Sequence, residues 1–229
     1  MNKLKMAKIS LVAILAIVLV ASQFAVYNYA SNIGYNNAIT SLAQALRQAG
    51  ATVNITDLGD GRYELKVHFP TATGQAGELS VPFELHMTVE QWRDGELVSR
   101  TTHPMTLTDL GKNWIADKIS GINTNFAKNA TYISVSNSSL AVDVAWTSID
   151  AEITDGGLAR ATNSTTDTGT GTWTCMITFS VTLTRSTKLY GYSYDSAGGL
   201  IAAEQQGTGS QKNLIDGDTL KITISGTIS

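Results

Sequence analysis

Residues 173–184 read WTCMITFSVTLT, in which large apolar side chains alternate with mostly polar ones. Side chains of a β-strand point to opposite faces in turn, so this spacing gives one apolar face and one threonine-rich face. The stretch predicts a strand with one face buried and the other in water. Its apolar face comprises Trp173, Cys175, Ile177, Phe179, Val181 and Leu183.

The same period of two recurs along the chain after residue 52. The dipeptide Asp94-Gly95 is a two-residue hairpin signal, so residues 97–102 should return antiparallel. Gly226 interrupts the last apolar alternation and is expected to form a bulge. Together these patterns predict a mainly β fold, an antiparallel β-sandwich in one or two blocks. The further alternating segments are residues 63–69, 81–89, 132–135, 190–194 and 220–228.

Other segments of the chain predict helices, a short strand and a loop. Apolar spacings of three and four predict an amphipathic helix over residues 31–49 and a short helix over residues 109–120, capped by Thr108. Residues 140–153 should include a helical turn, residues 158–162 a short strand and residues 167–171 a polar loop. The expected organisation is a membrane anchor or signal segment (1–30), a stalk helix (31–50), a first β block (51–107), a linking helix (108–121) and a second β block (122–229).

The N-terminal sequence indicates where in the cell the protein is located. Lys3, Lys5 and Lys8 precede a run at residues 9–20 that is apolar apart from one serine, and apolar residues continue to residue 30. One interpretation is a cleaved secretory signal. The other, which we favour, is an uncleaved anchor, because residues 9–30 can cross a hydrocarbon core of about 30 Å. A buried helix of a soluble protein is a third interpretation. The first two place the remaining chain outside the cytoplasm.

Composition narrows the classes of function. The 229 residues carry a net charge of −3, which argues against nucleic-acid binding driven by positive charge. A single cysteine excludes a disulfide framework within the chain. No nucleophile elbow or phosphate-binding glycine loop is present, and Cys175 falls on the expected inward face of its strand. We therefore expect no enzymatic activity.

Two acidic turns are candidates for structural calcium, which binds six to eight oxygens. One contains Asp57 and Asp60, and the other contains Asp216 and Asp218. The alternative is that each is a hairpin turn that needs Asp and Gly for positive φ. His68 and His86 offer a weaker metal hypothesis if the strand register brings them beside Glu64 or Glu84; the alternative is that they are solvated polar residues.

Two kinds of residue in the chain could bind or carry carbohydrate. Tryptophans and the tyrosines at 190, 192 and 194 could form a stacking platform for glycans, although core packing is the default for such residues. Four Asn-x-Ser/Thr triplets are candidate glycosylation sites if they are exposed. The candidate acceptors are Asn54, Asn129, Asn137 and Asn163.

Two groups of segments resemble known proteins. RDGELV (93–98) and LTDLGKNWI (107–115), within residues 89–121, look like a module of uncharacterised archaeal surface proteins. A second group is similar to β-domains in phage and archaeal-virus tail proteins. The resemblance implies an extracellular β-sandwich that assembles or adheres, and it carries no catalytic residues. The second group consists of YISV (132–135), AEI (151–153), GLAR (157–160) and residues 173–183.

Exposed strand edges make assembly the best-supported function from sequence. Filament subunits can donate a strand to a neighbour, and residues 219–229 and 51–58 are candidate donors. The alternative is that both segments pair within their own chain. We therefore expect a cell-surface protein, membrane-anchored or secreted, with a structural or adhesive role and self-association through edge strands. The alternatives are a virion tail-fibre-type protein and a glycan- or calcium-binding surface module.

Overall fold

The computed structural model describes residues 52–70, 76–120, 129–169, 172–207 and 210–228. The expected anchor (1–30) and stalk helix (31–50) lie outside these residues. Within the described ranges, no helix combines the length and apolar character needed to span a bilayer. The fold is mainly β with antiparallel sheets and one helix in the described part, as the sequence predicts.

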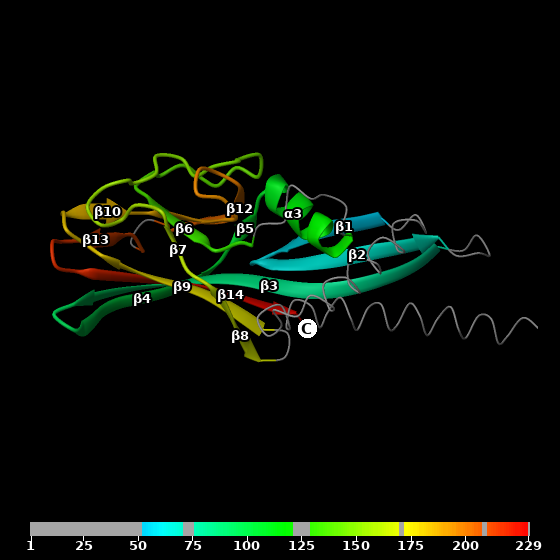
Figure 1. Cartoon of the computed structure of the whole chain (residues 1–229), viewed down its shortest axis with the longest axis horizontal. Helices are drawn as coiled ribbons and strands as arrows, with labels where there is room; N and C mark the ends of the chain where they lie inside the picture. Colours follow the sequence, from blue (N-terminus) through cyan, green and yellow to red (C-terminus); the bar gives the residue numbers. More distant parts are fainter. Residues whose placement is uncertain (1–51, 71–75, 121–128, 170–171, 208–209, 229) are drawn as a thin grey trace, which may run out of the picture.

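The larger sheet has seven strands. Its central strand, β14 (Thr219–Ile228), lies between β3 (Ala76–Arg93) and β9 (Thr172–Ser180), as Figure 1 shows. Strands from both expected β blocks therefore belong to one sheet. The remaining members are β1 (Thr52–Gly59), β2 (Arg62–Pro70), β4 (Glu96–Pro104) and β8 (Thr165–Gly169).

A five-stranded sheet lies against the larger one, in the order β5-β12-β11-β6-β7. Beside it, β10 (Arg185–Thr187) and β13 (Lys212–Leu214) form a two-stranded pair. The five strands are β5 (Thr106–Leu107), β6 (Tyr132–Ser136), β7 (Ala161–Thr162), β11 (Leu189–Ser193) and β12 (Leu200–Gln205).

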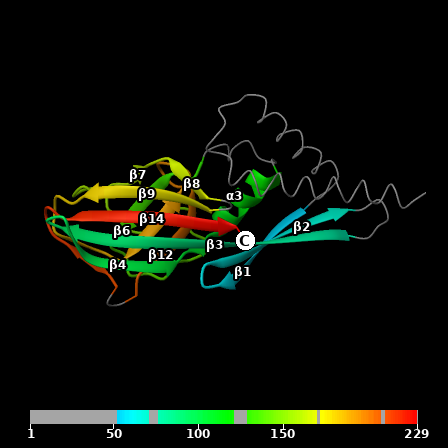
Figure 2. The ribbon, with the colours of Figure 1, turned by 90° about the horizontal axis from the view of Figure 1, so that it is seen from below.

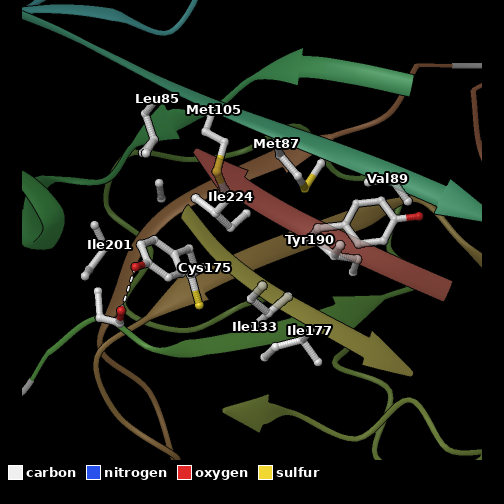
Figure 3. Packing of buried hydrophobic residues seen from close by; sticks show 14 of the residues in the cluster. Leu85, Met87, Val89, Met105, Ile133, Cys175, Ile177, Tyr190, Ile201 and Ile224 are labelled. Carbon is white, nitrogen blue, oxygen red and sulfur yellow. Dashed lines mark hydrogen bonds between the residues drawn. The ribbon is translucent and has the colours of Figure 1, made fainter. Parts of the chain in front are cut away.

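One hydrophobic core joins the two larger sheets. Met87 and Ile224 of the seven-stranded sheet pack in the same cluster as Ile133 and Tyr190 of the five-stranded sheet (Figure 3). All four side chains are fully buried. Burying apolar side chains stabilises a fold by about 1.5–3 kcal/mol each, so this shared core holds the sheets together.

Part of the larger sheet extends beyond the shared core. The last residue of β14, Ile228, pairs with Phe83, whereas β3 continues back to Ala76 paired only with β2 among the described strands. We call β1, β2 and residues 76–82 of β3 the arm (Figure 2). Thr52 pairs with His68 near its outer end, so the described chain enters the arm from there.

The helix α3 (Asp109–Ser120) contacts both β12 and β1, so it covers the inner end of the arm (Figure 1). The predicted cap is confirmed, because Gly111 N donates to Thr108 Oγ1 across 3.0 Å. Gly111 permits a close approach, since a Cβ there would lie 2.0 Å from Ile201 O. The helix and its start were therefore predictable from residues 108–120.

The predicted Asp94-Gly95 hairpin is also confirmed. Both residues have positive φ, 52° and 82°, as a type I′ turn requires. β4 returns antiparallel to β3 from this turn, with Arg93 opposite Glu96 and Gln91 opposite Ser99. A bulge between Gln91 and Trp92 adjusts the register.

Several local expectations were wrong. Residues 167–171 were expected as a loop, but β8 covers Thr165–Gly169 because it pairs with the edge of β9. Residues 140–153 form no helix; they contain a tight turn in which Trp146 N donates to Asp143 O, and Glu152 forms a bridge with Ser136. The strand expected over residues 158–162 is only Ala161–Thr162, and the strand at 173–184 ends at Ser180.

The bulge expected at Gly226 was wrong as well. Gly226 lies in unbroken register, opposite Leu85 on one side and Trp173 on the other. A Cβ at this position would lie 2.3 Å from Trp173 Cε2. The glycine therefore makes room for the indole ring.

Candidate functional site

The first acidic turn joins β1 to β2 and uses its acids to shape the backbone. Asp57 Oδ1 accepts a hydrogen bond from Gly59 N at 2.8 Å. Asp60 is exposed and has a φ of 56°, the left-handed conformation that Asp tolerates in turns. This geometry matches the hairpin interpretation of the motif.

The second acidic turn, before β14, contains a buried carboxylate with cationic and neutral partners. Asp218 accepts hydrogen bonds from Arg93 at 2.7 and 2.9 Å, from Gln91 Nε2 at 2.8 Å and from Ile215 N at 3.0 Å. These donors, led by the Arg93 side chain, lower the pKa of Asp218 to about 2. Asp216 is exposed.

The two turns do not come together. Arg62 beside the first turn pairs with Glu84, and Thr219 beside the second pairs with Trp92. At about 3.3 Å per residue along β3, these positions are about 26 Å apart. Among the described residues, no group of three or more His, Cys, Asp or Glu side chains is placed to hold a metal ion.

The register also separates the two histidines of the weaker metal hypothesis. His68 pairs with Glu78 near the outer end of the arm, whereas His86 pairs with Pro104 beside the shared core. His86 Nε2 lies 3.4 Å from Glu84 Oε2 on the same strand. The sheet therefore does not bring His68 and His86 to one site.

Cys175 lies on the inward face of β9 and is fully buried in the core (Figure 3). Burial raises the pKa of its thiol to about 11. A nucleophilic cysteine requires thiolate character and access to a substrate, and this environment provides neither. Its position matches the packing interpretation.

The candidate carbohydrate residues divide into two groups. All four glycosylation candidates, Asn54, Asn129, Asn137 and Asn163, are exposed. Asn163 also donates its side-chain amide to Met176 O at 2.7 Å.

The aromatic side chains, in contrast, are buried or half-buried. Tyr190 and Tyr192 are buried, and Trp173 stacks on Tyr192 with ring centroids 5.9 Å apart. Trp92, Trp114, Trp146 and Trp173 are all half-buried. The aromatic residues therefore contribute mainly to packing and do not form a continuous exposed platform.

A group of polar side chains that the sequence did not single out lies between the sheets. We call Thr101, His103, Glu204, Gln206 and Lys212 the polar cluster. Thr101 and His103 lie two residues apart on β4, and Glu204 and Gln206 lie two residues apart at the end of β12. Gln206 Nε2 donates to Thr101 Oγ1 at 3.1 Å, and His103 Nδ1 lies 4.0 Å from Glu204 Oε1.

The polar cluster is unusually well shielded from water. Gln206 and Lys212 are only 2% and 3% exposed. Gln206 Oε1 and His103 Nε2 are buried and have no hydrogen-bond partner within the described part of the chain. Unpaired buried polar atoms are uncommon in native proteins and call for a physical reason.

Burial changes the titration of the cluster. It raises the pKa of Glu204 to about 7 and lowers the pKa of Lys212. The pKa of His103 is lowered by burial and by the nearby Lys212 charge. These shifts favour the neutral imidazole of His103 and the protonated carboxyl of Glu204.

Comparison with known proteins gives no relative from which a role could be transferred. No family model, curated protein or solved structure matches the chain.

Proposed function

We propose that the chain is an extracellular, membrane-anchored structural or adhesive protein that self-associates through a sheet edge. The N-terminal lysines and the apolar residues 9–30 support the membrane anchor. Two antiparallel sheets that share one core support the β-sandwich body that such a role uses. The four exposed asparagines are compatible with glycosylation at the cell surface.

The observation that carries the self-association is the outer edge of β1, which pairs with no other described strand. This strand pairs only with β2 among the described strands, and its residues are mostly exposed. Thr52, the first residue that the structure describes, lies at the outer end of the arm. An edge strand has unpaired backbone groups that can bind a strand of a second copy.

The C-terminal segment is paired within its own chain in this structure and is not a donated strand. β14 pairs along its length with β3 and β9 of its own chain. β1 is therefore the better of the two candidate edges, and we propose pairing between β1 strands of neighbouring copies. Edge pairing of this kind needs no strand to leave its own sheet.

Charged substitutions on the edge strand test this proposal. Lysine on an edge strand opposes edge-to-edge pairing, so Asn54→Lys with Thr56→Lys should convert assemblies into monomers. Thr174→Lys is the matched control, because Thr174 is half-buried and lies on β9 between Ser225 of β14 and Thr166 of β8. Light scattering and electron microscopy of the full chain in detergent measure the assembly. A monomeric native protein, or assemblies unaffected by the β1 double variant, would contradict self-association through this edge.

A further inference from the structure

The polar cluster places a hydroxyl nucleophile against a carboxamide in a water-poor site. Gln206 Nε2 lies 3.1 Å from Thr101 Oγ1, and the carboxamide carbon is one bond from that nitrogen. Thr101 belongs to the seven-stranded sheet, whereas Gln206 directly follows β12 of the five-stranded sheet. The pair therefore bridges the two sheets. Holding two reacting groups close together in a fixed geometry removes much of the free-energy barrier that the same reaction has between separate molecules.

A histidine and a carboxyl group face each other next to this pair. His103 follows Thr101 by two residues on β4, and Glu204 precedes Gln206 by two residues at β12. Alternate residues of a strand share a face, so all four side chains lie in one layer between the sheets. His103 Nε2 has no hydrogen-bond partner in the described structure, and in the tautomer that carries the ring proton on Nδ1 its lone pair can accept a proton.

We propose that Thr101 and Gln206 form an intramolecular ester bond that covalently joins the two sheets. Thr101 Oγ attacks the Gln206 side-chain carbonyl carbon, and the new C–O bond replaces the C–N bond of the carboxamide. His103 takes the hydroxyl proton and returns it to the departing nitrogen, which leaves as ammonia. No oxidant, reductant or other reactant is consumed. The product is a Thr–Gln ester and one molecule of ammonia.

The remaining groups of the cluster fit this chemistry. Glu204 Oε1 faces His103 Nδ1 across 4.0 Å, and the ionised form of Glu204 stabilises the imidazolium that forms during proton transfer. Burial and the charge of the nearly fully buried Lys212 both lower the pKa of His103, which favours the neutral imidazole before the reaction. Burial of Gln206 shields the product from hydrolysis by water.

Peptide mapping of the full chain tests the bond directly. Trypsin cleaves after Arg100, Lys112, Lys188 and Lys212, so Thr101 and Gln206 lie on separate peptides, residues 101–112 and 189–212. The ester predicts one linked species whose mass is the sum of the two peptides less about 17 Da, the mass of ammonia. Hydroxylamine at alkaline pH should split it into its two halves.

Matched variants identify the nucleophile. Thr101→Val should abolish the linked species, whereas Thr101→Ser should retain it because the hydroxyl remains. Thr102→Val is the control, since Thr102 is exposed and its hydroxyl lies 2.9 Å from Thr88 Oγ1 on the other face. His103→Ala should slow formation of the bond at least tenfold in freshly synthesised chain.

Three results would overturn the proposal. The first is recovery of both wild-type peptides unlinked, with Gln206 intact. The second is a linked species that persists in Thr101→Val, and the third is a link that resists hydroxylamine, which would indicate an amide formed by Lys212. The wild-type map decides the question alone if a variant fails to fold. None of these results depends on the cellular location of the protein.

Discussion

The Asp218 carboxylate accepts two hydrogen bonds from the Arg93 guanidinium, at 2.7 and 2.9 Å, and this pair ties the start of β14 to the end of β3. The Asp218 side chain is fully buried, while the Arg93 side chain is 38% exposed. Gln91 and the backbone of Ile215 supply the other donors. The central strand of the larger sheet is therefore fixed at the turn where it begins.

Replacing this carboxylate should weaken the fold. Asp218→Asn removes the charge but keeps the size, and it leaves the donors of Arg93 and Gln91 poorly paired. We expect the free energy of unfolding to fall by about 1–3 kcal/mol, as for other buried hydrogen-bonded groups. Urea denaturation at neutral pH measures it. Asp216→Asn, at an exposed neighbour, should leave the stability within about 0.5 kcal/mol of wild type.

The same pair predicts a pH dependence. The pKa of Asp218 is lowered from 3.8 to about 2 in the folded protein, so the folded state binds its proton less readily than the unfolded state does. The contribution of Asp218 to the free energy of unfolding is complete above pH 3.8 and is lost as the pH falls toward 2. The stability difference between wild type and Asp218→Asn should therefore shrink over that range. A difference that stays constant down to pH 2 would contradict this assignment.

Gly226→Ala adds only one methyl group but should strongly destabilise the folded protein. The added Cβ would lie 2.3 Å from Trp173 Cε2, so the indole has to move from its position against Tyr192. Overpacking of this kind costs about 1–3 kcal/mol. Thermal unfolding followed by circular dichroism measures the loss. Gly207→Ala is the control, because a Cβ there would have no neighbour within 4 Å.

The cap of α3 gives a third test of stability. Thr108 Oγ1 accepts from Gly111 N and donates to Leu200 O at 2.5 Å, so one hydroxyl serves both the helix start and β12. Thr108→Ala should lower the free energy of unfolding by about 1–2 kcal/mol. Thr108→Ser keeps the hydroxyl and should restore most of it. Equal losses in both variants would show that the methyl group, and not the cap, is responsible.

Cys175 should be unreactive in the native protein. Its side chain is fully buried and its pKa is raised to about 11, so little thiolate is exposed at neutral pH. A thiol reagent should label less than about a tenth of the native chain in the time that labels the urea-unfolded chain completely. Rapid labelling of the native protein would contradict the packing role of this residue.

The sequence was most informative where one face of a strand is buried. Alternation located the strands around Tyr63 and Met87, and the Asp94-Gly95 dipeptide predicted the turn between β3 and β4. Alternation did not predict β8, because its sequence TTDTG has no apolar face and the strand is defined by pairing with β9. Backbone pairing of polar edge strands leaves little trace in hydropathy.

Contacts between distant segments explain the other misses. Gly226 was interpreted as a bulge because its sequence neighbours do not reveal Trp173 on the adjacent strand. The polar cluster was missed for the same reason. Thr101 and Gln206 come together only when the sheet that contains β4 packs against the sheet that contains β12. The hairpin signal predicted the return strand over residues 97–102, but it could not indicate which side chains of another sheet face Thr101.

We propose that the β body lies outside the cell on an N-terminal membrane anchor. The most direct measurement is protease treatment of intact cells, followed by fractionation and detection of both ends of the chain. We predict that the untreated chain sediments with membranes with residues 9–30 intact, and that added protease removes the β body without lysis. A chain that is recovered in the cytosol, or whose β body is protected until the cells are lysed, would contradict the account.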